Sequence, residues 1–273
     1  MLLSIVIATY KRPRELAEAL KSTAALLPLN FEIVVSDDSP TGEGREVCEQ
    51  ARDLYGLNLQ YNKREFPTGG KPAIVRNEAA TLVAGKYLYF LDDDDSLVPQ
   101  GVMSAIDALE KSGRAVAIAN VLPFSRNGLN ASAVAHEIQF FKEARSYLLT
   151  APTLWKIVSQ LNFGQTILVC SSCLVRQSVF HKIGGFDASI PLCEDVEMFQ
   201  RAIETGDYTY VDNDLLIRSC GESSLITNAT QEKLNASYFL IQEKFQKRIG
   251  NSKFLYLKII FKLNKYLEKL RLK

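Results

Sequence analysis

The clearest chemical feature of the sequence is a run of four aspartates at positions 92–95, which directly follows the apolar residues 87–91. Four carboxylates fixed at the end of a strand repel one another unless a cation lies among them. Mg²⁺ and Mn²⁺ are hard ions that bind carboxylate oxygens together with phosphate oxygens. The run therefore predicts a divalent metal site with a diphosphate as its partner. The simpler alternative is a solvated acidic loop that caps a helix beginning near Pro99.

A second acidic pair, Glu194 and Asp195, follows the segment Gly184-Gly-Phe-Asp187 and precedes a helical pattern. A carboxylate at a helix N-terminus is stabilised as an anion by unpaired backbone N–H groups, and it can act as a general base where it faces a cleft. Taken alone, the pair is better explained as an ordinary helix cap. Its function therefore depends on what the fold places beside it.

Two other segments have the residue types that contact nucleotides. Asp37 and Asp38 follow the apolar residues 31–35 and could accept hydrogen bonds from a base or from ribose, although turn chemistry explains them as well. Residues 68–77 supply two glycines that permit close backbone approach and two cations suited to phosphate: Gly69, Gly70, Lys71 and Arg76. The spacing is not that of a P-loop.

Alternating strands and helices must position these residues. Continuous β-rich runs predict strands at residues 2–8, 31–35, 57–61 and 86–91, and helical periodicity predicts helices from Pro13 and at residues 45–54, 72–83 and 196–205. This alternation indicates an α/β protein with a mostly parallel central sheet flanked by helices. Ligands collect at the carboxyl ends of such strands, so Thr9 and Tyr10 should lie close to the acidic clusters.

The later part of the chain is less regular. The pattern predicts helices at residues 137–149 and 152–161, a strand at 166–175, and short strands at 208–211 and 215–218, but residues 121–165 give no defined arrangement. Two C-terminal helices, at residues 231–248 and 254–272, are divided by Gly250 and Asn251.

The composition excludes several classes of protein. The 273 residues are 47% hydrophobic and 23% charged, which excludes collagen-like, low-complexity and wholly disordered chains. A formal net charge of +1 does not indicate a nucleic-acid partner. Residues 244–273 nevertheless hold ten Lys or Arg and one acid, Glu268, so this segment carries +9 and the rest of the chain −8.

The basic C-terminal segment has the pattern of an amphipathic helix. Its lysines recur on one side and its apolar residues on the other: Lys258, Lys262, Lys265, Lys269 and Lys273 against Ile259, Ile260, Leu263, Leu267 and Leu270. In a membrane interface, each lysine near an anionic leaflet contributes about 1 kcal/mol. We expect membrane-surface contact through residues 253–273, with packing on the acidic body as the alternative. No segment is apolar enough to predict a transmembrane helix.

The cysteines favour a reduced, cytoplasmic setting. The chain has five of them, an odd number, and its N-terminus lacks the pattern of a signal peptide. One C-x-x-C pair, Cys170 and Cys173, is not enough to predict a zinc site. Neither histidine stands in a catalytic or metal-binding arrangement.

In this order, the segments resemble the inverting nucleotide-sugar glycosyltransferases of family two, which have the GT-A fold. The matching stretches are Ser4-Ile-Val-Ile-Ala-Thr-Tyr-Lys-Arg-Pro13, Glu32-Ile-Val-Val-Ser-Asp-Asp-Ser39, Val75-Arg-Asn-Glu-Ala79, Gly85-Lys-Tyr-Leu-Tyr-Phe-Leu-Asp-Asp-Asp-Asp95, and Gly184-Gly-Phe-Asp187 ahead of Glu194-Asp195. Each stretch is weak alone, whereas the combination over residues 3–218 is specific. The resemblance implies a single GT-A domain over residues 1–226 and a C-terminal helical extension over residues 227–273.

The resemblance also implies a role for each matching position. Asp92 and Asp94 fill the D-x-D positions for Mn²⁺ or Mg²⁺, with Asp94 as the direct ligand, and Asp195 aligns with the general base. The remaining positions would contact the nucleotide, with Asp93 at the ribose and Arg76 at the nucleoside or the diphosphate: Ala8, Thr9, Tyr10, Asp38, Arg76 and Asp93.

The implied reaction is metal-dependent, inverting transfer of one sugar from a nucleotide-diphosphate donor, a UDP-sugar, to a hydroxyl group. The acceptor would be a glycan or lipid-linked precursor of a cell-surface polysaccharide at the cytoplasmic face of the cell membrane. Two alternatives are a sugar nucleotidyltransferase and a non-catalytic carbohydrate-assembly module. The former resembles G-x-G-T-R after the first strand, where this chain has Ala8-Thr-Tyr-Lys-Arg12.

Two departures from the family pattern stand out. Many relatives place a histidine where this chain has Arg218-Ser-Cys-Gly221, so a supplementary metal ligand is missing and we expect modest metal affinity. The chain also lacks a Gln-x-x-Arg-Trp signature. It therefore does not resemble a processive synthase.

Overall fold

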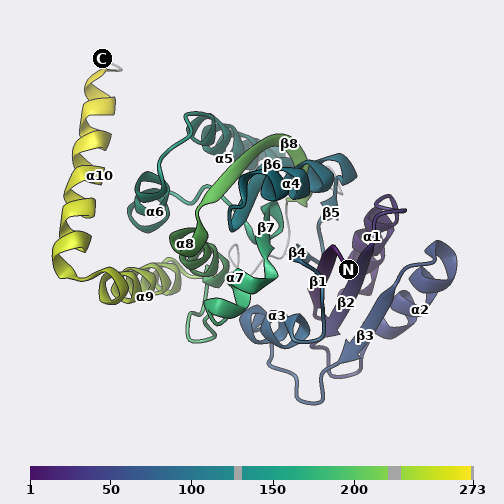
Figure 1. Cartoon of the computed structure of the whole chain (residues 1–273). Helices are drawn as coiled ribbons and strands as arrows, with labels where there is room; N and C mark the ends of the chain where they lie inside the picture. Colours follow the sequence, from purple (N-terminus) through teal and green to yellow (C-terminus); the bar gives the residue numbers. More distant parts are fainter. Residues whose placement is uncertain (126–130, 221–228, 272–273) are drawn as a thin grey trace.

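The computed structural model describes residues 1–125, 131–220 and 229–271, and it contains one eight-stranded mixed sheet (Figure 1). The strand order is β3-β2-β1-β4-β7-β6-β8-β5. The strands are β1 (Leu3–Thr9), β2 (Phe31–Asp37), β3 (Leu59–Lys63), β4 (Tyr87–Asp92), β5 (Ser96–Leu97), β6 (Val116–Phe124), β7 (Cys173–Arg176) and β8 (Tyr208–Ser219).

The first half of the sheet is parallel, and its register brings the polar strand ends together. Strands β3, β2, β1 and β4 run in one direction, as the alternation of elements predicts. Thr9 at the end of β1 is paired with Asp37 of β2, and Ala8 is paired with Asp92 of β4. The carboxyl ends of three strands therefore meet at one edge, where ligands bind in sheets of this kind.

The second half of the sheet differs from the sequence prediction at two places. A strand was expected over residues 166–175, but β7 begins only at Cys173 and follows a short 3₁₀ turn, Cys170–Ser172. The two short strands expected at 208–211 and 215–218 form one continuous strand, β8, which pairs in parallel with β6 through two register shifts. Strand β7 is antiparallel to both β4 and β6, so the sheet is mostly but not wholly parallel.

Helices cover both faces of the sheet (Figure 1). Three of them, α1, α3 and α4, begin with proline in the first turn, where its missing N–H costs no hydrogen bond. The helices before the C-terminal segment are α1 (Pro13–Ala24), α2 (Gly44–Tyr55), α3 (Pro72–Ala80), α4 (Pro99–Ser112), α5 (Ala131–Leu149), α6 (Leu154–Phe163), α7 (Gln177–Lys182) and α8 (Glu194–Gly206).

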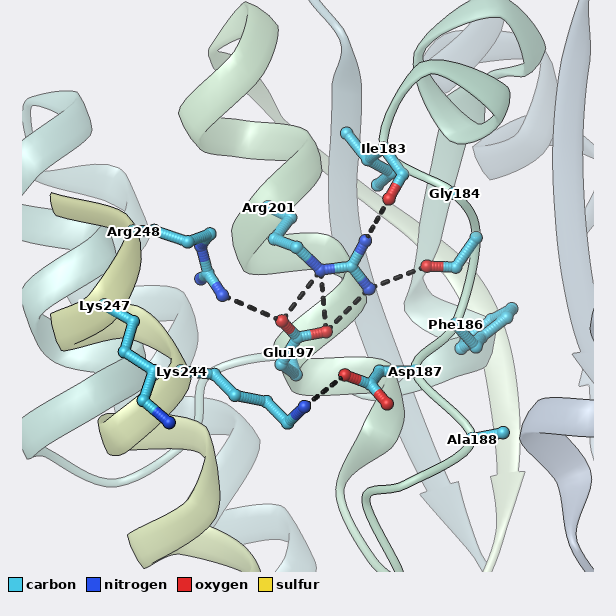
Figure 2. A pocket seen from close by; sticks show the side chains of 11 residues that line it. Ile183, Gly184, Phe186, Asp187, Ala188, Glu197, Arg201, Lys244, Lys247 and Arg248 are labelled. Carbon is cyan, nitrogen blue, oxygen red and sulfur yellow. Dashed lines mark hydrogen bonds and ion pairs between the residues drawn. The ribbon is translucent and has the colours of Figure 1, made fainter.

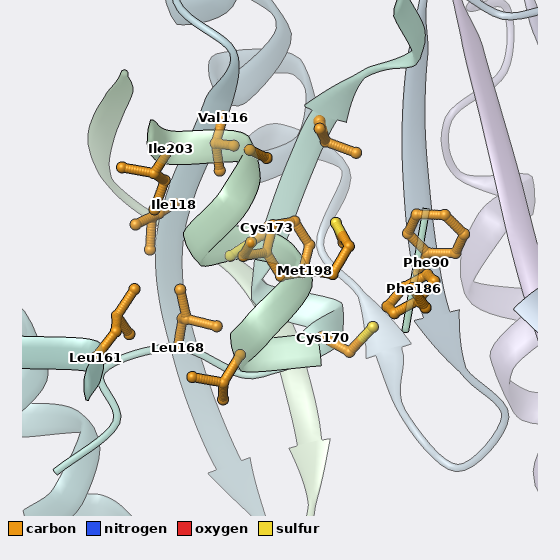
Figure 3. Packing of buried hydrophobic residues seen from close by; sticks show 14 of the residues in the cluster. Phe90, Val116, Ile118, Leu161, Leu168, Cys170, Cys173, Phe186, Met198 and Ile203 are labelled. Atoms are coloured by element: carbon orange, nitrogen blue, oxygen red, sulfur yellow. The ribbon is translucent and has the colours of Figure 1, made fainter. Parts of the chain in front are cut away.

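The hydrophobic core lies on the two faces of the sheet. One cluster centres on Phe90 of β4, whose ring lies 4.9 Å from that of Phe186 in an edge-to-face arrangement. Helix α8 packs its apolar stripe on this face, and Figure 3 shows Met198 and Ile203 pointing at the strand residues. Phe186, Ile190 and Leu192, which precede α8, are buried in the same cluster. The core therefore fixes the position of the N-terminus of α8.

Two helices end the described chain, α9 (Gln231–Ile249) and α10 (Asn251–Arg271). They are separated at Gly250, as the sequence predicts. Ile241 and Phe245 of α9 are buried in the core, so this helix is packed on the body. No helix in the described part of the chain combines the length and the apolar character needed to cross a bilayer. The expected boundary at residues 226 and 227 lies outside the described residues and stays a prediction.

Candidate active site

A cavity of about 270 Å³ opens at the carboxyl edge of the parallel strands. The nine residues to which the family resemblance assigns roles all line it: Ala8, Thr9, Tyr10, Asp38, Arg76, Asp92, Asp93, Asp94 and Asp195. Asp37 and Gly69, which the residue types alone suggested as nucleotide contacts, are not among its lining residues. The strand ends of β1, β2 and β4 thus share one cavity with the start of α8. The structure brings the predicted residues together, and it leaves their individual roles as predictions.

Arg76 on α3 joins the two acidic clusters. Its guanidinium donates to Oδ1 of Asp92 at 2.7 Å and to Oε1 of Glu194 at 2.8 Å. The same group lies over the ring of Phe186, 5.5 Å from the centroid. Bidentate bridging of this kind needs the planar fork of arginine, because a lysine ammonium is a point charge. Arg76 is therefore buried as a positioning group between the end of β4 and the N-terminus of α8.

The turn before α8 is shaped to hold Phe186 beneath Arg76. Asn77 of α3 accepts from the Phe186 N–H and donates to the Phe186 carbonyl, both at 2.8 Å. Gly185 has φ +69°, a left-handed conformation, and a Cβ there would collide with the Asn77 side chain. The glycine pair of the sequence therefore allows α3 and this turn to approach closely.

Asp93 and Asp94 are engaged by residues from the first strand and its loop. Thr9 donates to Asp93 at 2.7 Å. Nη1 of Arg12 lies 3.2 Å from Asp93 Oδ1 and 2.9 Å from Asp94 Oδ2. The sequence reasoning gave Arg12 no role. The only signal was its place in a basic pair directly after the strand, which does not identify its partner.

Burial and mutual repulsion raise the pKa values of this acidic cluster. Burial raises the pKa of Asp93 to about 7, and the charge of Asp94 adds to the effect. Burial and the charge of Asp92 likewise raise the pKa of Asp94. Asp95 is almost fully buried, and its pKa is raised well above the usual value although it accepts from the Ser219 N–H at 3.0 Å. The raised pKa values indicate that ionising these carboxyls together is unfavourable, and a cation placed among them would favour their ionised forms.

The two aspartates after β2 have different surroundings. Asp37 is fully buried and accepts from the N–H groups of Ser39 and Gly44 and from the Tyr61 hydroxyl, so it organises the turn. Asp38 lines the cavity and also accepts from the N–H and the hydroxyl of Thr68, both at 2.7 Å. Asp38 thereby fixes the glycine-containing loop at the cavity edge.

Glu194 and Asp195 at the start of α8 differ in how they are held. Glu194 is tied to Arg76, and burial raises its pKa to about 7. Asp195 is partly exposed to the cavity, and its Oδ1 accepts from the N–H of its own neighbour Val196 at 2.9 Å. Burial raises the pKa of Asp195, and the positive charge of Arg76 opposes this shift. A carboxylate with a raised pKa that faces a cavity is suited to accept a proton.

The other end of the Gly184–Asp187 turn is bound to α8 and α9, as Figure 2 shows. Arg201 of α8 donates to the carbonyls of Ile183 and Gly185, both at 2.6 Å, and pairs with the buried Glu197. Lys244 of α9 pairs with Asp187 at 2.8 Å. These contacts surround a second cavity of about 510 Å³ and hold the turn that precedes Asp195.

The residues present fit a metal ion that arrives with a diphosphate. In the part of the chain that the structure describes, no three His, Cys, Asp or Glu side chains form a ready metal cluster. Asp92 and Asp94 both line the cavity, with side chains 25% and 30% exposed. Mg²⁺ commonly binds through one or two carboxylates, with phosphate oxygens and waters completing the shell. Two accessible carboxylates therefore suit such an ion.

Arg218, at the end of β8, is a second cavity residue that the sequence reasoning did not assign. Its guanidinium lies 4.0 Å from Asp95 and 3.3 Å from Glu137 of α5. It stands at the position where the family resemblance led us to note a missing histidine. An arginine there supplies positive charge to the cavity and cannot ligate a metal.

The sequence matches the family described as Glycosyl transferase family 2 over residues 4–184. The chain belongs to this family. A glycosyltransferase of Haemophilus influenzae is 22% identical over 260 residues, which are 92% of this chain and 80% of that protein. The poly(ribitol-phosphate) β-N-acetylglucosaminyltransferase TarS of Staphylococcus aureus is 28% identical over 163 residues, which cover 59% of this chain but only 26% of TarS.

Solved structures have the same fold as this glycosyltransferase. S. aureus TarS 1–349 in complex with UDP-GlcNAc matches with a TM-score of 0.71 and 19% identity, covering 96% of this chain and 71% of that chain. A mannosyltransferase of Pyrobaculum calidifontis in complex with GDP-Man and Mn²⁺ matches with a TM-score of 0.58 and 11% identity, covering 95% of this chain and 73% of that one. The expected GT-A fold is confirmed.

Proposed function

We propose that this glycosyltransferase inverts configuration, depends on a divalent metal, and moves one sugar from a nucleoside-diphosphate donor, a UDP-sugar, to a hydroxyl group. The observation that carries the proposal is the shared cavity: Asp92 and Asp94 at the end of β4 line it together with Asp195 at the start of α8. Direct displacement requires the donor with its leaving group and the acceptor with its general base to meet in one site.

The donor would bind along the ends of β1 and β2. Ala8, Thr9 and Tyr10 line the cavity and would hold the nucleoside with Asp38. Asp38 already accepts hydrogen bonds from Thr68, and carboxylate oxygens have lone pairs for more. Asp93 would accept from a ribose hydroxyl, and Arg76 would orient the nucleoside or the diphosphate.

Asp92 and Asp94 would hold Mn²⁺ or Mg²⁺, with Asp94 as the direct ligand. When bound, the ion supplies positive charge next to the departing diphosphate. Asp92 is also held by Arg76 at 2.7 Å, which orients its carboxylate toward the cavity edge. The structural neighbour from P. calidifontis was solved with GDP-Man and Mn²⁺, which supports the choice of ion.

Asp195 would act as the general base. It accepts the proton of the acceptor hydroxyl while that oxygen forms a bond to the anomeric carbon. The bond between this carbon and the diphosphate oxygen breaks, and its electron pair leaves with the nucleoside diphosphate. Attack from the face opposite the leaving group inverts the configuration. The pKa of Asp195, raised by burial, brings its basicity closer to neutral pH.

The acceptor would be a glycan or a lipid-linked precursor in cell-surface polysaccharide synthesis. Two relatives support this class: TarS is named for poly(ribitol-phosphate), and a Campylobacter jejuni relative, 29% identical over 123 residues, is named a GalNAc(5)-diNAcBac-PP-undecaprenol β-1,3-glucosyltransferase. We place the protein in the cytoplasm and at the cytoplasmic face of the cell membrane. Residues 1–226 would form the catalytic domain and residues 227–273 the membrane-contacting extension.

A thermal-shift panel of UDP-, GDP-, CMP- and dTDP-sugars, each with and without Mn²⁺, tests the proposal. Binding raises the stability of the fold by RT ln(1 + [L]/Kd), so a UDP-sugar with Mn²⁺ should raise the melting midpoint most. Asp94→Asn should remove the Mn²⁺-dependent part of the shift. Asp107→Asn, the same change on the exposed face of α4, should leave it intact. Absence of a metal-dependent shift with every nucleotide would defeat the proposal.

Two additional measurements separate the alternative functions: thermal shifts with UTP and glucose 1-phosphate, and release of nucleoside diphosphate from the nucleotide sugar over time. A sugar nucleotidyltransferase would respond to a nucleoside triphosphate and a sugar phosphate, so a larger shift with UTP and glucose 1-phosphate than with any nucleotide sugar would favour it. A non-catalytic module would bind a nucleotide sugar and release no nucleoside diphosphate over time.

A further inference from the structure

Helix α10 has two separate apolar faces. Figure 1 shows it (yellow) as the outermost helix on the side of the molecule away from α2. One face, formed by Phe254, Leu257 and Phe261, is directed at the body. The other face has eight large apolar side chains that are 37–63% exposed: Leu255, Tyr256, Ile259, Ile260, Leu263, Tyr266, Leu267 and Leu270.

The inner face accounts for the packing of α10 on the body. Phe254 and Leu257 are buried, and the ring of Phe163 on α6 lies 5.3 Å from Phe254 and 6.0 Å from Phe261. A Cβ at Gly164 would lie only 2.8 Å from the Phe261 ring, so this glycine allows the close approach. The sequence left two alternatives for this helix, packing on the body and contact with a membrane. The helix packs on the body through Phe254, Leu257 and Phe261, and these are not the apolar residues that the sequence placed opposite the lysines.

The outer face is continuous along the helix. Its residues recur at spacings of three and four, from Leu255 to Leu270, which places them on one broad stripe of a 3.6-residue helix. A contiguous exposed apolar surface of this kind is unusual in a protein that remains fully in water, and it marks an interaction site. The helix spans 21 residues, about 30 Å at 1.5 Å per residue.

Charge and aromatic side chains border this face in the pattern of an interfacial helix. Lys258, Lys262 and Lys265 lie along one edge at spacings of four and three. At the other edge Lys253 lies over the ring of Trp155 on α6, 3.5 Å from its centroid. Trp, Tyr and Lys at the border of an apolar stripe are the residues that anchor a helix at the headgroup level of a bilayer.

A groove of about 720 Å³ between α6 and α10 opens beside the outer face. Its walls include Trp155 of α6 and Tyr256, Ile260 and Leu267 of α10. Three residues of the outer face therefore also line the groove. The apolar surface is thus wider than a single helical stripe and continues onto the body of the protein.

We propose that the outer face of α10, together with the α6–α10 groove, docks on the surface of an anionic lipid bilayer, with the helix lying in the plane of the interface. The apolar stripe enters the acyl boundary, and the bordering lysines contact anionic headgroups. This deepens the proposed function by naming the surface that holds the enzyme beside a lipid-linked acceptor, and it rests on that function only for the acceptor.

Charge argues against a second copy of the chain as the occupant. A symmetric pair would bring the same face of each copy together. The lysine edges of both helices would then lie at one interface, and Glu268 is the only acid in α10. It already pairs with Lys265 of its own helix at 3.3 Å. An anionic bilayer, in contrast, complements every lysine on this border.

Vesicle co-sedimentation of the full chain tests the proposal, with vesicles of phosphatidylcholine alone and of phosphatidylcholine mixed with phosphatidylglycerol. We expect binding to the mixed vesicles and at least tenfold weaker binding to the neutral ones. The double variant Ile259→Ser/Leu263→Ser should lose about tenfold or more in affinity. Lys258→Gln/Lys262→Gln should lose about fivefold per lysine, the equivalent of about 1 kcal/mol each. Leu54→Ser, a matched change at an exposed leucine of α2, should bind as the wild type does.

Three outcomes would overturn the proposal. In the first, the wild type does not bind anionic vesicles. In the second, Leu54→Ser loses as much vesicle affinity as the α10 variants do. In the third, the wild type is a dimer in solution and Ile259→Ser/Leu263→Ser converts it to a monomer. Melting midpoints with and without UDP and Mn²⁺ are measured for every variant. Unchanged midpoints show that the variants fold, and unchanged nucleotide shifts separate membrane docking from donor binding, so either claim can fail while the other stands.

Discussion

At the scale of single residues, the cavity is lined by more acidic than basic side chains, and arginines offset part of the negative charge. Arg76 of α3 pairs with both Asp92 and Glu194, and Arg12 from the loop after β1 bridges Asp93 and Asp94. Arg76 is buried, whereas the Arg12 side chain is 29% exposed. Arg12 therefore lies at the cavity mouth, on the same carboxylate that we propose as the direct metal ligand.

This geometry predicts that Arg12 competes with a divalent ion. Arg12→Gln should raise the affinity for Mn²⁺ alone, without nucleotide, by about tenfold, because the ion no longer displaces a guanidinium from Asp94 and meets one positive charge fewer. The loss of the free Mn²⁺ signal in electron paramagnetic resonance measures this affinity directly.

Arg14→Gln is the matched control for the Arg12 experiment. It removes the same charge from an exposed side chain two positions along the chain, and it should leave Mn²⁺ affinity unchanged. If Arg12→Gln binds Mn²⁺ as the wild type does, or more weakly, then Arg12 does not occupy the metal position.

At the scale of elements, the turn before α8 is held from two sides. Asn77 of α3 fixes Phe186, and Lys244 of α9 fixes Asp187. The C-terminal helix α9 therefore contributes to the position of the helix that carries Asp195. Burial opposes ionisation of Asp187, but hydrogen bonds from Lys244 and Ser189 outweigh it and lower the pKa of Asp187 to about 2.

The lowered pKa of Asp187 makes a prediction about stability and pH. The stabilisation is fully present above the unfolded-state pKa, near 4, and it is lost as pH falls toward the folded-state value of about 2. Asp187→Asn should therefore lower the free energy of unfolding by about 1–2 kcal/mol at pH 7, a value discounted for partial exposure. The difference from wild type should shrink between pH 4 and pH 2.

Urea unfolding at a series of pH values measures this difference. Asp107→Asn, which removes an exposed pair with Lys111 within α4, should change stability by only a few tenths of a kcal/mol. A difference between Asp187→Asn and wild type that stays constant or grows as the pH falls would show that the ion pair with Lys244 does not stabilise the turn.

The strands of the parallel half of the sheet could be predicted because the apolar segments there are both buried and paired in the sheet. Residues 2–8 were expected as a strand and form β1, Leu3–Thr9, since a strand covered on both faces is apolar throughout. Residues 167–170 are also apolar, but they are largely buried without strand pairing, which begins only with β7 at Cys173. The Ser171 hydroxyl accepts from the Asp92 N–H at 3.0 Å, and its carbonyl accepts from the Tyr89 hydroxyl.

The candidate site was predictable to the extent that it follows from topology. The carboxyl ends of parallel strands meet at one edge, so Thr9, Asp38 and Asp92 had to be close. The partners of Arg12 and Arg218 are set by tertiary packing between distant segments, and no local pattern indicates them. For Asp37, residue type alone is misleading. An aspartate at a strand end suits a ligand contact, but the Asp37 side chain is fully buried and holds a turn.

At the scale of the whole molecule, the fold joins three functions that the sequence keeps apart. The strand ends of the N-terminal half form the proposed donor edge, and α8 from the second half adds the proposed base. Helix α9 holds the turn before α8 through Lys244, and α10 adds an exposed apolar face. We propose that the donor edge binds the nucleotide sugar and that Asp195 acts on the acceptor in the same cavity, so the two contribute separately to binding and to chemistry.

The most direct measurement of this claim compares UDP affinity with the rate at which UDP is released from UDP-GlcNAc, with water as the acceptor, in wild type and Asp195→Asn. For Asp195→Asn we expect a UDP affinity in Mn²⁺ within about twofold of wild type and a release rate lower on the order of 10²–10⁴-fold, because only the base is lost. Asp207→Asn, the same change at the other end of α8, should alter neither quantity. Loss of UDP affinity together with turnover, or an unchanged release rate in Asp195→Asn, would show that Asp195 is not the general base.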